Sequence, residues 1–387
     1  MPTMTALEGP VTQPSGALGS CKSGASAKHN AVLAGLRGLA ILAVMLYHFT
    51  GGYKGSIPLL HAWALIAGAG WMGVDLFFVL SGFLITGILY DTIHAEHRVR
   101  NFYARRSLRI FPLFYAVLFG LFFLSRPLQL HWRPEHLVYF TYLSNVVLVF
   151  LPHFQPPSHW VNLGHLWSLA VEEQFYLIWP FVVWTVRRRG LLLKIIFTAL
   201  LAGPIVRGLL LLKGMDPSTM TELLWTRGDS LLFGAAASLL VRGTAEYLAT
   251  AKAILIGSIL LIAVCIYAAG GPIATSYWFS TIGYSALAAF SASIIYFAQQ
   301  GARWTSLLFN RPLLQFFGRY SYGLYLFHGL YFVYLRNLTG ALESRLHSGV
   351  VAQLLIVLVG FALSILLAML SYHYFEAPIL KLKSRFT

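Results

Sequence analysis

The chain has 387 residues, of which 58% are hydrophobic and only 11% are charged, and its mean hydropathy is +0.69. A soluble domain carries about 25% charged residues. This composition therefore excludes a soluble globular protein and predicts an all-α polytopic membrane protein. The formal charge of +15 does not indicate nucleic-acid binding, because most of the 28 Lys and Arg residues lie in short runs between apolar stretches.

The two ends of the chain differ in character from its long middle part. Residues 1–30 are rich in Gly, Ser, Thr and Pro and contain no apolar run, so we predict a disordered cytoplasmic tail rather than a signal peptide. Residues 381–387 form a short basic tail, also expected in the cytoplasm. Residues 31–380 show no repeat of 20–50 residues and no soluble catalytic domain, which predicts one membrane-embedded domain that carries all the chemistry.

Apolar stretches bounded by charges, Gly or Pro predict a bundle of about ten transmembrane helices. They fall near residues 31–50, 68–90, 110–125, 166–186, 191–212, 223–241, 253–270, 277–299, 312–335 and 349–374. With both termini on one side, that side collects most of the Lys and Arg between the stretches. The positive-inside rule then predicts a multi-pass protein of the inner (plasma) membrane with both termini in the cytoplasm.

Residues 137–151 are apolar enough to enter the membrane but short for a crossing. A full crossing there would place the three consecutive arginines at 187–189 outside and would invert every later loop. We therefore predict a re-entrant or interfacial segment around 137–151, within an external region.

Arg37 and His48 lie inside the first apolar stretch, where ionisable groups are expensive. Residues eleven apart on an ideal helix differ by about three turns plus ~20°, so both side chains share one stripe, roughly 16 Å apart. Intramembrane ionisable groups of this kind usually face a protein interior or a water-filled path. The pattern indicates a functional pair of a base and a cation at different membrane depths.

Several motifs in the chain resemble the acyltransferase-3 family of integral membrane O-acyltransferases. They follow the family order over nearly the whole chain, from about residue 33 to residue 380. The matching segments are LRGLA at 36–40 with YH at 47–48, GVDLFFVLSGF at 73–83, RRSLRIFP at 105–112, HLWSLAVEEQFY at 165–176, RGD at 227–229, YSY at 320–322 with His328, and FEAP at 375–378.

This resemblance implies transfer of an acyl group from a cytoplasmic acyl-CoA to a hydroxyl, commonly on a sugar of a surface polysaccharide or another glycan. Acetyl is the default acyl group, since acetyl-CoA is the common cellular donor. The expected partners are therefore acyl-CoA, a hydroxylated acceptor and the lipid bilayer, with no permanently bound cofactor. No metal site is expected, because the histidines are scattered and Cys21 and Cys265 form no ligand pattern.

Attack of an alcohol on a thioester needs a base, and the imidazole of His48 suits that role. Glu172 and Glu173 fall early in a helix that enters from outside, so a depth near His48 is expected for both. A carboxylate bonded to one ring nitrogen would fix the tautomer of His48. Adjacent residues differ by about 100° on a helix, so only one glutamate can do so, and we slightly favour Glu173. Arg37 completes the predicted catalytic set, with its role left open.

Arg106 and Arg109, with Arg105 beside them, are predicted to bind the phosphates of the donor on the cytoplasmic side. Arginines at i and i+3 offer two guanidinium forks to phosphate oxygens. The long pantetheine arm of coenzyme A would then carry the thioester into the bundle.

Acceptor-site candidates are fewer and less distinctive. They are Asp75, Trp167, Tyr176 and His328, each polar or amphipathic and each within or beside a predicted helix. Asp75 equally fits a structural ion pair with an arginine.

Three alternatives stay open at this stage. A proton-coupled transporter would use Arg37, His48 and the glutamates as a relay, but the chain lacks repeated halves. An inactive regulatory relative would keep the motifs without turnover. An acyltransferase could also act on a small molecule such as a macrolide. Acceptor identity, acyl length, direct transfer versus a relay, and oligomeric state are not readable from the sequence.

Overall fold

The computed structural model describes residues 18–50, 58–151, 153–154, 156–158 and 160–386, and these ranges contain helices and no strand. The all-helical fold class predicted from composition is therefore confirmed. The helices of ten or more residues are α1 (Leu18–Thr50), α2 (Pro58–Gly68), α3 (Gly73–Asp91), α4 (Arg98–Phe123), α7 (Trp167–Val186), α8 (Arg189–Leu212), α9 (Leu224–Val241), α10 (Leu248–Ala268), α11 (Tyr284–Gln299), α13 (Pro312–Asn337) and α15 (Gly349–Ser371).

The first helix starts earlier than the sequence analysis predicted. α1 begins at Leu18, whereas residues up to 30 were expected to be a disordered tail. The reason is local, because residues 18–30 contain Ala and Lys and no Pro, and such a segment can extend a helix that the apolar stretch already forms. Residues 1–17 of the predicted tail lie outside the described residues.

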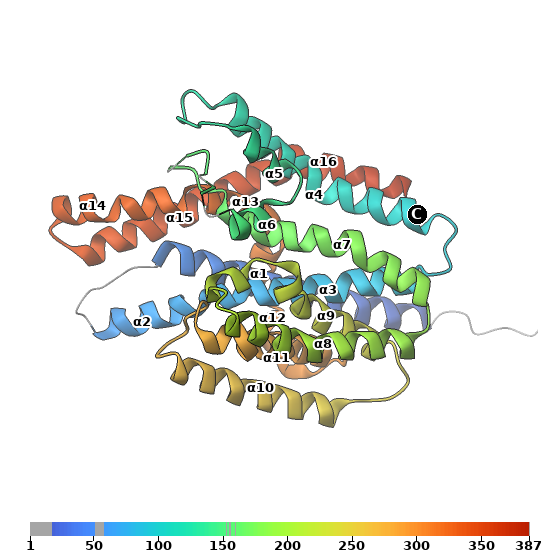
Figure 1. Cartoon of the computed structure of the whole chain (residues 1–387). Helices are drawn as coiled ribbons and strands as arrows, with labels where there is room; N and C mark the ends of the chain where they lie inside the picture. Colours follow the sequence, from blue (N-terminus) through green and yellow to red (C-terminus); the bar gives the residue numbers. More distant parts are fainter. Residues whose placement is uncertain (1–17, 51–57, 152, 155, 159, 387) are drawn as a thin grey trace, which may run out of the picture.

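Seven helical segments in the described ranges are long and apolar enough to cross a membrane. They are Ala31–Thr50, Trp63–Asp91, Arg98–Phe123, Arg189–Leu212, Leu248–Ala268, Phe279–Gln299 and Gly349–Arg385. The predicted count of about ten is not reached by this criterion. Figure 1 shows the long helices running roughly side by side, with α1 starting at the end of the bundle where the chain ends.

The centre of the bundle is built by α1, which packs against α13 and α3. Two glycines allow α1 and α13 to approach backbone to backbone. A Cβ on Gly38 of α1 would collide with the carbonyl of Leu314, and a Cβ on Gly318 of α13 would collide with the carbonyl of Ala34. Such small-residue contacts are a common means of close helix packing in membranes.

Close backbone contacts at glycines also join α3 to α9. A Cβ on Gly82 would meet the carbonyl of Leu231, and a Cβ on Gly234 would meet the carbonyl of Val79. These two close contacts join α1 to α13 and α3 to α9. Since α1 also packs against α3, polar residues of the four helices face one common interior.

Residues 137–151, predicted as a re-entrant or interfacial segment, form two short helices. These are α5 (Leu137–Phe140) and α6 (Ser144–Phe150). Neither is long enough to cross a hydrocarbon core of about 30 Å, which takes about 20 helical residues. α6 packs against α7 and buries Asn145 completely, while Leu137, Leu143 and Phe150 are exposed, so the segment has one buried side and one exposed side.

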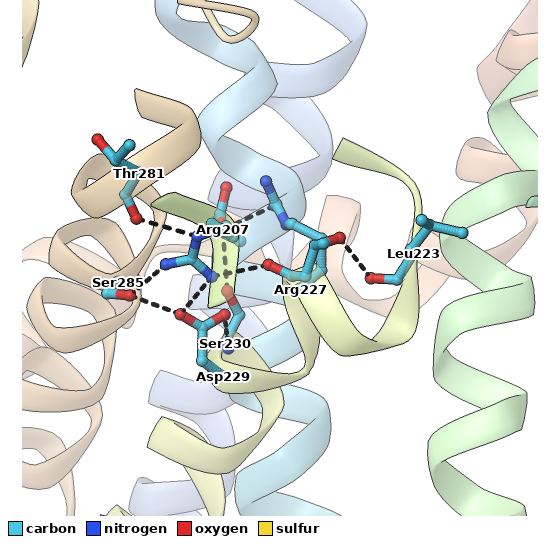
Figure 2. A network of polar contacts seen from close by, with 9 residues as sticks. Arg207, Leu223, Arg227, Asp229, Ser230, Thr281 and Ser285 are labelled. Carbon is cyan, nitrogen blue, oxygen red and sulfur yellow. Dashed lines mark hydrogen bonds and ion pairs between the residues drawn. The ribbon is translucent and has the colours of Figure 1, made fainter. Parts of the chain in front are cut away.

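Two buried ion pairs join α3, α8, α9 and α11. Arg207 of α8 donates to Asp229 of α9 at 2.9 Å and to the Ser285 hydroxyl of α11 at 2.6 Å, as Figure 2 shows. Arg227 of α9 donates to Asp75 of α3 at 2.8 Å. A charge without a partner is very costly in such a place, so each pair fixes the rotation of its helices.

Candidate functional site

Three arginines from two helices converge on one cavity. Arg37 of α1 and Arg106 and Arg109 of α4 line a cavity of about 100 Å³, together with Glu172 of α7 and Tyr322 of α13. We call this the arginine cavity. Arg109 is exposed and Arg106 is half-buried, so the cavity joins a surface to the interior. The C-terminal segments that follow α15 pack against α4.

The arginine cavity combines excess positive charge with hydroxyl groups. Ser81, Ser168, Ser321 and Tyr325 also line it. Guanidinium groups and hydroxyls are the donors that phosphate and carbonyl oxygens accept from. Arg105 is exposed on α4 and does not line the cavity, so the structure separates it from the other two arginines of its motif.

Glu172 and Glu173 lie beside Arg106, not beside His48. The distances are 3.9 Å from Arg106 Nη2 to Glu172 Oε2 and 4.0 Å from Arg106 Nε to Glu173 Oε1. The expectation that one glutamate contacts His48 is therefore not met. The reason is the depth of each residue along the bundle. A short 3₁₀ turn (Gly164–Leu166) places His165 beside His328, which contacts His48. Glu172 follows about 10 Å further along the helix.

Tyr176 supports Arg106 from the next turn of α7. Its ring centroid lies 3.8 Å from Arg106 Cζ, and its hydroxyl is hydrogen-bonded to Ser81 of α3. Tyr176 is almost fully buried and lines neither cavity described in this section. Its contact with the Arg106 guanidinium is a cation–π contact, and its expected role in binding substrate stays a prediction.

A second cavity, of about 390 Å³, contains His48. We call it the histidine cavity. His48 of α1 shares its wall with His165, Trp167 and Glu222, while aromatic side chains supply much of the remaining surface. Further lining residues are Tyr47, Trp71, Asn162, Thr221, Arg227, Thr275, Tyr284 and Phe332. Trp167, predicted as an acceptor-site residue, thus lines the same cavity as His48.

His48 is hydrogen-bonded to another histidine. Its Nδ1 lies 2.9 Å from Nε2 of His328, and Nδ1 of His328 lies 2.9 Å from the carbonyl oxygen of Leu324. A carbonyl only accepts, so Nδ1 of a neutral His328 carries its hydrogen and Nε2 accepts from His48. These two hydrogen bonds leave the lone pair of His48 on Nε2. No hydrogen bond from the described residues reaches that lone pair.

Packing also holds the His48 ring in place. Phe332, one turn beyond His328 on α13, stacks on it with ring centroids 4.2 Å apart. His328 itself is fully buried behind His48 and does not line the cavity. His328 therefore contacts His48 rather than the cavity, and its expected contact with the substrate stays a prediction.

Val74 and Tyr325 line both cavities. Tyr325 is fixed by its hydroxyl, which donates to the carbonyl of His165 at 3.1 Å and lies 2.5 Å from the Ser168 hydroxyl. The sequence analysis missed Tyr325, because a tyrosine in an apolar helix carries no signal of its own. Asp75, by contrast, is fully buried against Arg227 and lines neither cavity.

Glu222 is the second residue that sequence reasoning missed. It follows a 3₁₀ turn (Pro217–Thr221) just before α9, and its side chain faces the histidine cavity. Burial raises the pKa of Glu222 to about 7. An acid between two apolar stretches was the available signal, although Asp216 lies in the same connection. No group of three or more His, Cys, Asp or Glu side chains suited to a metal ion occurs among the described residues.

Comparison with known proteins shows which family the chain resembles. A model of the acyltransferase domain family matches residues 30–373. The peptidoglycan O-acetyltransferase OatA of Listeria monocytogenes is 36% identical over 228 residues, which cover 54% of this chain and 34% of the relative. The putative peptidoglycan O-acetyltransferase YrhL of Bacillus subtilis is 29% identical over 367 residues, covering 90% of this chain and 54% of the relative.

A putative O-acetyltransferase of Staphylococcus aureus is 28% identical over 374 residues, which cover 90% of this chain and 57% of the relative. The chain thus spans between a third and three fifths of the length of these relatives. No solved structure matches the chain.

Proposed function

The chain belongs to the acyltransferase domain family, and from that premise we propose that it transfers an acetyl group from cytoplasmic acetyl-CoA to a hydroxyl of a cell-envelope glycan. The arginine cavity would bind the donor and the histidine cavity the acceptor. The observation that carries the proposal is the free Nε2 lone pair of His48, set by the hydrogen bonds from His48 to His328 and from His328 to Leu324.

We place the donor in the arginine cavity because of the cavity's charge and its size. A cavity of about 100 Å³ is smaller than a typical pocket for a drug-sized ligand, about 300–1,000 Å³. It would accept the narrow thioester arm of acetyl-CoA, with the nucleotide phosphates outside near the exposed Arg109. Arg37 and Arg106 would contact the deeper part of the arm. The acetyl group would then reach Val74 and Tyr325, which line both cavities and are where we place the junction between them.

His48 would act as the general base at that junction. Its Nε2 takes the proton from the acceptor hydroxyl while the oxygen attacks the thioester carbonyl. The new C–O bond forms, the C–S bond breaks, and the proton on His48 passes to the departing thiolate of coenzyme A. Nδ1 of His48 keeps donating to His328 throughout, so the ring does not rotate.

Membrane topology is part of the same proposal. α7, α9 and α13 fall outside the seven segments that are apolar enough to span, yet they contain 20, 18 and 26 residues. Their polar residues include Glu172 and Ser168 of α7, Arg227 and Asp229 of α9, and Tyr325 of α13, which line the two cavities or form the ion pairs. We propose that these three also cross, which gives ten spans in the plasma membrane with both termini in the cytoplasm, the arginine cavity inward and the histidine cavity outward.

The names of the relatives make peptidoglycan the first acceptor to test. Purified protein in detergent would receive radiolabelled acetyl-CoA and isolated peptidoglycan, in parallel with the His48→Gln variant. Label in the glycan with the natural protein alone is the expected result. Binding of acetyl-CoA to both proteins with label in neither would contradict the acyl transfer, and substrate uptake into liposomes without acetyl-CoA would favour a transporter.

A further inference from the structure

Glu222 is an acid without a protein partner in a cavity where other charged groups are paired. In the described part of the chain, no hydrogen bond or ion pair reaches its carboxylate. Four other buried acids each have a cation, namely Asp75 with Arg227, Asp229 with Arg207, and both Glu172 and Glu173 with Arg106, while Glu376 accepts a hydrogen bond from Ser371. A carboxylate left free at a cavity wall is available to a ligand.

The backbone of Glu222 is held by residues from two other helices. Asn145 of α6 donates to the carbonyl of Glu222 at 3.0 Å. The side-chain oxygen of Asn145 accepts from Gln174 of α7 at 2.8 Å, and Gln174 also donates to the carbonyl of Tyr142 at 2.9 Å. Because Asn145 is fully buried, this clamp fixes the place of Glu222 relative to α7. The position of the acid is therefore built into the fold.

The surroundings of Glu222 suit a sugar. Trp71 and Trp167 offer aromatic surface to the cavity, while Asn162, Thr221 and Thr275 offer side-chain hydrogen-bonding groups. The guanidinium of Arg227 also reaches the cavity, but it is paired with Asp75 and stacked on Tyr284 at 3.7 Å. No free cation from the described residues lines this wall to balance a negative ligand.

We infer that Glu222 binds the acceptor, by accepting hydrogen bonds from hydroxyls of a neutral sugar unit next to the hydroxyl that is delivered to His48. The inference rests on the proposed transfer to a glycan. A carboxylate accepts from two hydroxyls at once, whereas it repels a uronate or a phosphate at the same distance. Glu222 therefore selects neutral sugars over acidic ones.

A binding titration tests this without turnover. The full chain in detergent is titrated with chitotetraose, a neutral tetramer of N-acetylglucosamine, and with the anionic tetragalacturonate, and tryptophan fluorescence is followed because Trp71 and Trp167 line the cavity. We expect chitotetraose to bind and tetragalacturonate to bind at least tenfold more weakly. Glu222→Gln should weaken chitotetraose binding about 10- to 100-fold and leave acetyl-CoA binding unchanged.

The matched control is Glu135→Gln, which removes one charge from an exposed acid that pairs with Arg133 away from the cavity. It should bind chitotetraose as the natural protein does. Equal affinity of Glu222→Gln and the natural protein would overturn the inference, and so would equal binding of both sugars or of neither. Glu222-dependent sugar binding without acetyl transfer would instead refute the proposed function and leave the binding role of Glu222 standing.

Discussion

Nδ1 of His48 lies 2.9 Å from Nε2 of His328, and the His48 ring is stacked on Phe332. A histidine here takes the place that a carboxylate occupies in hydrolase triads, where it fixes the tautomer of the catalytic imidazole. A neutral imidazole can fix the tautomer without adding a second charge to an apolar interior, where an ionised carboxylate would need its own partner.

The first prediction concerns this positioning contact. His328→Phe should lower kcat for acetyl transfer by about 10²- to 10⁴-fold, because His48 loses the acceptor that fixes its tautomer. His328→Gln keeps an acceptor oxygen and should recover part of the rate. Acetyl-CoA affinity should stay unchanged in both variants. Equal kcat values for the Phe and Gln variants would show that the hydrogen bond is not what matters.

The second prediction separates the arginines of α4. Arg109→Ala should weaken acetyl-CoA binding about tenfold or more, since a hydrogen bond to a charged group contributes about 1.5–3 kcal/mol. Arg105→Ala is the matched control, because Arg105 lies on the same helix but outside the arginine cavity. Isothermal titration with acetyl-CoA measures both. A larger effect at Arg105 than at Arg109 would place the donor elsewhere.

The third prediction concerns the close approach of α3 and α9. Gly82→Ala should destabilise the protein by about 1–3 kcal/mol or more, because the new methyl group would collide with the backbone of Leu231. Gly208→Ala is the control, since nothing lies within 4 Å of a Cβ at that position of α8. Its thermal transition in detergent should be unchanged or higher. Similar transitions for the two variants would argue against the close packing.

The fourth prediction concerns the ion pair of Arg207 and Asp229 (Figure 2). Asp229→Leu should be strongly destabilising, by about 3–5 kcal/mol, because it leaves a buried guanidinium without its carboxylate. Adding Arg207→Met should restore much of the loss, since the double variant removes both charges. Thermal unfolding of the single and double variants gives the coupling. Additive losses would mean that the two residues act independently.

The fifth prediction follows from the pKa of Glu222, which burial raises to about 7. The ionised form accepts the hydrogen bonds, so chitotetraose affinity should rise from about pH 6 to about pH 8 as the carboxylate loses its proton. Glu222→Gln should show no such rise. The other titratable or charged groups near Glu222 are His48, His165, Arg227, Tyr47, Tyr139, Tyr284 and Tyr325. These are common to both proteins, so the difference between the two profiles isolates Glu222.

The helices were largely predictable because the signal for each is local. The stretch predicted at 191–212 is α8 (Arg189–Leu212), and the one predicted at 223–241 is α9 (Leu224–Val241). Length and apolarity of a single segment predict such a helix, whatever the rest of the chain does, although α9 does not meet the criterion for a membrane span. Prediction was less accurate at Leu18 and at Arg98, where polar residues continue a helix beyond its apolar part.

The sequence by itself determined the all-helical membrane fold, the order of the motifs and the family, because these depend on composition and on residues that are near one another in the chain. Only the tertiary structure decided which polar groups meet. It paired His48 with His328, grouped both glutamates with Arg106, and placed Tyr325 in the lining of both cavities. These contacts join residues as many as 280 positions apart, so they depend on how helices rotate and slide against one another. That is set by close glycine contacts and buried ion pairs, which no single segment encodes.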